Sequence, residues 1–96
     1  MHKFKHKQLL NLTNGKYHDG KGLYISITSP GSGKWSFRYR LDHKSREMGL
    51  GPFPETSIVD ARHKAEDKRR LVLQKIDPIE DKKRQDILRN QQGKKF

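Results

Sequence analysis

The chain has 96 residues, which is the length of one domain with a single hydrophobic core. Hydrophobic residues make up 30% of it and charged residues 34%, so a large enzyme is excluded and at most two layers of secondary structure are expected. Its 22 Lys and Arg residues outnumber its 11 Asp and Glu residues, and the formal net charge of +11 creates a field that attracts polyanions. Nucleic acid is therefore the first candidate partner, and an anionic membrane surface ranks well behind it.

The first 21 residues are expected to form a basic arm and a loop. They mix basic residues with three leucines and end in "HDGKG", whose Asp and Gly residues are turn formers. The next stretch, "GLYISIT" at 22–28, alternates apolar with polar residues. That alternation is typical of a half-buried strand.

Two further strands are predicted, each preceded by a turn. The loop "SPGSG" at 29–33 combines Pro with two Gly residues and predicts a hairpin connection of three to five residues. The dipeptide "DH" at 42–43 predicts a second, tighter turn, because Asp tolerates the left-handed region. Apolar residues recur at every second position from Trp35 to Leu41. The predicted sheet therefore has three antiparallel strands in chain order, at about 22–28, 34–41 and 44–50.

A helix is predicted over about 57–75. Ser57 followed by Asp60 resembles a capping box, and the apolar residues after it form one stripe at helical spacing. "KIDPIED" then indicates a stop and a restart, with Pro78 in the first turn of a new helix. Residues 77–96 hold few apolar side chains and are expected to form a linker helix and tail. The predicted fold class is α+β, a three-stranded antiparallel sheet packed on one face by a C-terminal helix and followed by the linker helix.

The second face of the predicted sheet is polar and combines short side chains with guanidinium groups. Three strands at a spacing of ~4.8 Å make a sheet about 10 Å wide. The DNA major groove is ~12 Å wide, so such a face enters the groove only if most of its side chains are small. A polar face that is merely solvated is the alternative, but the positive charge favours nucleic acid. The residues on this face are Tyr24, Ser26, Thr28, Ser36, Arg38, Arg40, Ser45, Glu47 and Gly49.

The candidate DNA contacts divide by chemistry. Arg38 and Arg40, on the central strand, are the candidates for base reading, because Arg bonds guanine O6 and N7 in bidentate fashion. The other candidates are short hydroxyls at Ser26, Thr28, Ser36 and Ser45, a sugar or methyl contact at Tyr24, and phosphate contacts near the turns at Lys21, Lys34, Lys44 and Arg46.

The same residues carry a family resemblance. The segment "YHDGKGLYISITSPGSGKWSFRYRLDHKSREMGLGPFPETSIVDAR" at 17–62 resembles the N-terminal arm-type DNA-binding domain of prophage and genomic-island tyrosine integrases, and the resemblance runs from about Lys7 to Glu80. Ile58 replaces the usual Leu, and Lys75 replaces the usual Gly, which argues against a tight glycine-type helix ending. The matching residues are Asp19, Gly20, Gly22, Leu23, Tyr24, Pro30, Lys34, Trp35, Phe37, Arg38, Tyr39, Leu50, Gly51, Pro54, Ser57, Ala61, Arg62, Leu71, Val72, Asp77 and Pro78.

The resemblance implies sequence-specific binding of double-stranded DNA by residues 22–76, with the sheet in the major groove of attachment-site arm sequences. It also implies partners: DNA-bending proteins, a core-binding domain, and a catalytic domain with an Arg-His-Arg-Tyr constellation. Neither of those domains fits in this chain, so it is expected to be an excised domain or a truncated gene product that lacks catalysis. A bacterial, cytoplasmic location is expected.

No catalytic, cofactor or metal site is predicted. His43 and Arg46 have the H-x-x-R spacing of recombinases, but they lie at a predicted hairpin turn. "PGSGK" lacks the first Gly and the final Ser or Thr of a phosphate loop. His2 and His6 are four residues apart, but the chain has no Cys and no third clustered ligand. No apolar run approaches the length of a membrane span, and the N-terminus is not a signal peptide.

Two alternative functions remain open from the sequence. A double-stranded RNA-binding domain also combines a three-stranded sheet with helices, but it needs a substantial helix before the sheet, and residues 1–21 offer little room for one. A small basic ribonuclease of the bacterial toxin type would use the His and Arg residues as acid, base and phosphate clamp. Incubation with RNA separates these alternatives, because a binding module leaves RNA intact.

Overall fold

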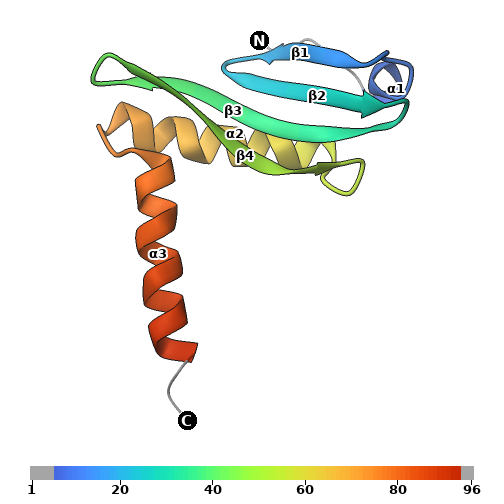
Figure 1. Cartoon of the computed structure of the whole chain (residues 1–96). Helices are drawn as coiled ribbons and strands as arrows, with labels where there is room; N and C mark the ends of the chain where they lie inside the picture. The colour runs from blue at the N-terminus through green and yellow to red at the C-terminus, as the bar shows by residue number, and fades with distance from the viewer. Residues whose placement is uncertain (1–5, 94–96) are drawn as a thin grey trace.

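The computed structural model of the protein describes residues 6–93, so the first residues of the predicted arm, including His2, and the last residues of the tail lie outside the described part. The chain forms a sheet with one long helix against it and a second long helix that extends away from it (Figure 1). The elements are α1 (His6–Leu9), β1 (Gly15–Gly20), β2 (Leu23–Ser29), β3 (Ser32–Leu41), β4 (Lys44–Phe53), α2 (Ile58–Leu73) and α3 (Pro78–Gly93).

The sheet has four antiparallel strands in the order β1-β2-β3-β4, so the α+β class is confirmed and the predicted number of three strands is wrong. The additional strand β1 lies in the segment that was expected to be arm and loop. Lys21 and Gly22 make the turn into β2 with φ of 51° and 85°, and two successive positive φ values are those of a tight type I′ hairpin. The glycines of "HDGKG" therefore close a hairpin instead of ending an irregular arm.

The other two hairpins are also tight. Ser29 pairs with Ser32, which leaves only Pro30 and Gly31 in the connection, shorter than the predicted loop. Gly31 has φ of 76°, as the second central residue of a turn that begins with Pro requires. The turn at Asp42 and His43 has φ of 51° and 66°, as predicted for a two-residue connection.

The core lies between the sheet and α2, which covers one face of the sheet (Figure 1). Ser57 caps α2, because its hydroxyl accepts a hydrogen bond from the Asp60 amide at 3.1 Å. The indole of Trp35 donates a 2.8 Å hydrogen bond to the carbonyl of Thr56, which holds the loop before α2 against the sheet. The buried apolar residues are Leu9, Leu23, Ile25, Ile27, Trp35, Phe37, Tyr39, Met48, Leu50, Phe53, Ile58, Ala61 and Ala65.

The helix α2 ends in a tight glycine-type turn, although Lys75 was expected to argue against one. Lys75 adopts φ of 65°, its amide donates to the Val72 carbonyl at 2.9 Å, and the Ile76 amide donates to the Leu71 carbonyl at 2.8 Å. These two bonds form the Schellman ending that usually contains Gly, so Lys75 occupies the left-handed position that the absence of Gly argued against. The chain therefore turns sharply before α3, which points away from the sheet (Figure 1).

Candidate nucleic-acid interface

Within residues 6–93, no helix packs against one face of the sheet, because α2 lies on the opposite face (Figure 1). Cross-strand pairs in an antiparallel sheet project to the same side, so the register identifies the residues of this open face. The open face is defined here as Lys16, His18, Tyr24, Ser26, Lys34, Ser36, Arg38, Arg40, Ser45, Glu47 and Gly49.

One cross-strand row of the open face has only small residues on β3 and β4. It runs across all four strands as His18, Tyr24, Ser36 and Gly49. A Cβ atom on Gly49 would meet no atom within 4 Å, so nothing of the protein fills the space above this position. At Gly49, beside the edge of the sheet, the face is therefore open enough for another molecule to approach the backbone.

The two predicted base-reading residues lie together on the open face. Arg38 and Arg40 are exposed on β3, opposite Glu47 and Ser45 of β4. The Arg38 amide donates a 2.8 Å hydrogen bond to the Gly22 carbonyl, which fixes this part of β3 against the β1–β2 turn. A shallow hollow brings together five of these positions and two neighbours, and it is lined by His18, Gly22, Tyr24, Arg38, Tyr39, Arg40 and Ser45.

The remaining predicted contacts lie at different places around this face. Ser26 and Ser36 are in its centre, and Lys34 is exposed on β3. The other predicted contacts are exposed towards the turns: Thr28 near the end of β2, Lys21 at the β1–β2 turn, and Lys44 and Ser45 after the β3–β4 turn.

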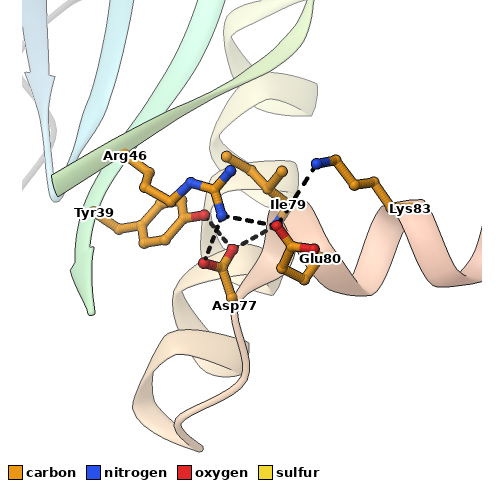
Figure 2. A network of polar contacts seen from close by, with 6 residues as sticks. All are labelled: Tyr39, Arg46, Asp77, Ile79, Glu80 and Lys83. Atoms are coloured by element: carbon orange, nitrogen blue, oxygen red, sulfur yellow. Dashed lines mark hydrogen bonds and ion pairs between the residues drawn. The ribbon is translucent and has the colours of Figure 1, made fainter. Parts of the chain in front are cut away.

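Arg46 differs from the other predicted contacts, because it lies on the opposite side of β4, in register with Tyr39. Its guanidinium donates to Asp77 at 3.1 Å and to Glu80 at 2.9 Å, at the start of α3 (Figure 2). The Tyr39 hydroxyl donates to the other oxygen of Asp77 at 2.5 Å, and the Ile79 amide donates to that same oxygen at 2.9 Å. Arg46 therefore ties the β3–β4 hairpin to α3.

These contacts shift the acidities of the groups at this junction. Burial would raise the pKa of Asp77, but hydrogen bonds from Tyr39, Ile79 and Arg46 outweigh it, and the pKa falls below its ordinary value. The hydrogen bond from Arg46 lowers the pKa of Glu80. Burial and the Asp77 carboxylate raise the pKa of Tyr39 to about 12. The junction thus holds two carboxylates ionised and a phenol neutral.

Sequence reasoning missed two contributors to the open face and left a third unassigned. Lys16 and His18 come from β1, and the His18 ring stacks on Tyr24 with centroids 4.5 Å apart. Glu47 was placed on the polar face but given no role. The Gly-rich stretch "DGKG" was the sequence signal that could have revealed β1, because Gly is common at the positive φ positions of tight hairpin turns.

The fold and this face together define a small basic nucleic-acid-binding domain. Within residues 6–93 no helix is long and apolar enough to cross a membrane. Among those residues no three His, Asp or Glu side chains are grouped as metal ligands.

Comparison with known proteins gives the family. Residues 3–85 match the family model of the arm DNA-binding domain, and the chain belongs to this family. DNA binding is therefore its family function, which does not support the double-stranded RNA-binding and ribonuclease alternatives.

The similar curated proteins are integrases. The chain is 38% identical over 80 residues to prophage integrase IntA of Escherichia coli strain K12. This alignment covers 81% of the chain and 19% of that integrase. It is 35% identical over 65 residues to the integrase of Shigella phage Sf6, in an alignment that covers 68% of this chain and 17% of the relative. The integrase of enterobacteria phage P4 is 35% identical over 65 residues, or 66% of this chain and 15% of the relative. The chain thus spans less than a fifth of these relatives.

Proposed function

We propose that the protein binds duplex DNA sequence-specifically by laying the open face of its sheet in the major groove, as the arm-site-binding part of a tyrosine-recombinase integrase. In this role it contributes no catalysis; a core-binding domain and a catalytic domain, aided by DNA-bending proteins, would carry out integration and excision. The observation that supports the proposal most directly is the open face itself, whose short side chains are bordered by exposed cations.

The contacts follow from the positions of the side chains. Arg38 and Arg40 project from a central strand and have the bidentate donors that guanine O6 and N7 accept. Ser26, Ser36 and Ser45 are short enough to let the backbone approach the base edges. Thr28 and Tyr24 add a hydroxyl and a sugar or methyl contact. The cations towards the turns, Lys21, Lys34 and Lys44, lie where flanking phosphates would pass.

A steric substitution tests the groove geometry. Gly49 has no positive φ, and a Cβ atom added to it would meet no atom within 4 Å, so Gly49→Leu places a bulky side chain on the open face. We expect the affinity for a duplex from the host attachment region to fall by about fivefold or more, a loss of at least the 1–3 kcal/mol that one mismatched base pair typically costs. Fluorescence anisotropy with that duplex, a scrambled duplex and a matched double-stranded RNA measures the change.

The matched control is Val59→Leu, which enlarges an exposed apolar residue on α2, away from the open face. This variant should bind as the original chain does. If Gly49→Leu also binds the attachment duplex with unchanged affinity, the open face does not enter the groove.

A further inference from the structure

An ion pair crosses the open face from one edge of the sheet to the other. Lys16 lies on β1 and Glu47 on β4, the two outer strands, and the Lys16 ammonium is 2.5 Å from a Glu47 carboxylate oxygen. The register places Lys16 in the row of Ser26 and Glu47 in the row of Arg38. The line between them therefore crosses the row in between, over the pair formed by Tyr24 and Ser36.

Two observations agree with this path. The Lys16 ammonium is 5.3 Å from the centroid of the Tyr24 ring, over its face. Ser36 is only 8% exposed, although no helix in the described part of the chain covers its side of the sheet. Its hydroxyl has no hydrogen-bond partner among the described residues. A buried hydroxyl without a partner is costly, so its place beneath the ion pair points to a contact that forms when the pair opens.

Glu47 is the only carboxylate among the residues of the open face, and its charge restricts what it can meet in DNA. The base edges in the major groove are mostly acceptors, and the only donors there are the amino groups of cytosine and adenine. Glu accepts from cytosine N4. Arg38 lies directly opposite Glu47 in the register, and Arg is the usual partner of guanine. Neighbouring side chains of these two types suit a guanine and a cytosine that are close together.

We propose that the Lys16–Glu47 pair is a latch over the open face, and that Glu47, released when DNA docks, accepts a hydrogen bond from a cytosine N4 amino group and so determines specificity. Lys16 then moves to a phosphate, and the Ser36 hydroxyl becomes accessible to a base edge. Opening costs little, because the two side chains are 43% and 40% exposed and exposed ion pairs contribute little to stability. This inference rests on the proposed binding of duplex DNA by the open face.

The test compares the full chain with its Glu47→Gln variant. Each is used to select binders from a library of duplexes with a randomised central segment, and the enriched position that carries cytosine is then replaced by each other base pair in matched duplexes. We expect the original chain to prefer the cytosine pair by about 5- to 100-fold, as single base-pair changes usually cost. The Glu47→Gln variant should shift that preference towards adenine, because the Gln amide both accepts from N6 and donates to N7 of adenine, while it retains the preference for the guanine assigned to Arg38.

Glu55→Gln is the matched charge control, because Glu55 is exposed in the segment between β4 and α2. Both variants remove one negative charge, so both should bind duplexes that lack the cytosine pair somewhat more tightly. If the two variants show the same base preferences as the original chain, Glu47 acts only through its charge and the inference is wrong. If the original chain itself selects no sequence, the proposed sequence-specific function fails, and this outcome is distinct from the first.

Nuclear magnetic resonance tests whether the Lys16–Glu47 pair opens when DNA binds. Lys16→Gln removes the partner of Glu47, and we expect the carboxylate carbon resonance of Glu47 in the free protein to move towards the position that it takes when duplex DNA is added to the original chain. A Glu47 resonance that does not respond to saturating DNA would show that the pair stays closed and would overturn the proposal.

Discussion

At the level of single residues, two motif positions explain how the sheet and α2 are joined. Asp19 is fully buried at an irregularity between His18 and Gly20 of β1. The guanidinium of Arg62 on α2 donates to its two carboxylate oxygens at 2.9 and 3.0 Å. The bidentate geometry compensates for the burial of the charge. Arg62, a cation that could have been read as a DNA contact in a basic protein, therefore joins α2 to the sheet instead.

Removing this pairing should destabilise the fold. Asp19→Asn leaves the Arg62 guanidinium without its counter-charge, and breaking a buried pair in this way costs about 3–5 kcal/mol. Urea unfolding followed by circular dichroism measures the change in the free energy of unfolding. Glu66→Gln is the control, because Glu66 pairs with Arg69 at the surface of α2 and should change stability by less than about 1 kcal/mol. Equal effects of the two substitutions would contradict the structural role of Asp19.

Arg38 is one of the two residues that we propose to contact bases in the major groove. Arg38→Ala should lower the affinity for the attachment duplex by about 1–3 kcal/mol and affect a scrambled duplex less, because a bidentate guanine contact exists only at the specific site. Anisotropy titrations of both duplexes measure the two losses. Arg70→Ala, at a position 70% exposed on α2, controls for the loss of one positive charge. An equal loss on both duplexes would make Arg38 a phosphate contact.

The candidate contacts could be predicted from the sequence where strand alternation applies. The face of Tyr24, Ser26, Ser36 and Arg38 follows from alternation alone, and the register agrees with it. The position of Arg46 also follows from alternation, but its pairing with Asp77 and Glu80 does not, because that contact joins residues about thirty positions apart. The ion pair of Lys16 and Glu47 was likewise beyond sequence reasoning, since it required β1.

At the level of elements, β1 shows which part of the fold sequence patterns could not predict. The strand "GKYHDG" has only Tyr17 as a large apolar residue, so it has no apolar alternation to recognise. It forms because the Lys21–Gly22 turn brings it beside β2, where the ladder satisfies its backbone groups. Strands β2 and β3, which each carry three buried apolar side chains, were predictable for the opposite reason.

The junction of α3 with the hairpin should depend on pH at both extremes. The pKa values of Asp77 and Glu80 lie below their ordinary values of 3.8 and 4.5, so their contribution is fully present above those values and is lost as the pH falls through the lower folded values. The pKa of Tyr39 is raised from 10.0 to about 12, so its contribution is present below pH 10 and is lost as the pH rises towards 12.

Nuclear magnetic resonance of the Ile79 methyl groups, which pack against the core, reports the state of this junction. We expect the methyl shifts to change below the ordinary carboxylate values and again above pH 10. Asp77→Asn should remove most of the acid transition, and Tyr39→Phe should remove the alkaline one. Methyl shifts that stay constant through both ranges would show that the network does not hold α3.

At the level of the whole molecule, the charge of +11 does not act as one uniform field. Some cations are occupied within the protein: Arg46 anchors α3, Arg62 pairs with Asp19, and Lys64 donates to the Leu50 carbonyl at 3.1 Å. Others surround the open face and are exposed. The cations available to phosphates are therefore fewer than the 22 Lys and Arg residues of the chain, and position in the fold decides which they are.

This division of the cations predicts the salt dependence of binding. Each phosphate contact contributes about −0.9 to the slope of log affinity against log salt, so contacts from Lys16, Lys21, Lys34 and Lys44 give a slope of about −4. Lys34→Gln should reduce the magnitude of the slope by about 1 and weaken binding to specific and scrambled duplexes alike. Arg46→Gln should leave the slope unchanged, because its guanidinium already serves Asp77 and Glu80. Anisotropy titrations across a salt series measure all three slopes. If Arg46→Gln lowers the slope as Lys34→Gln does, Arg46 leaves the α3 junction to contact DNA, and the helix must then be released when the protein binds.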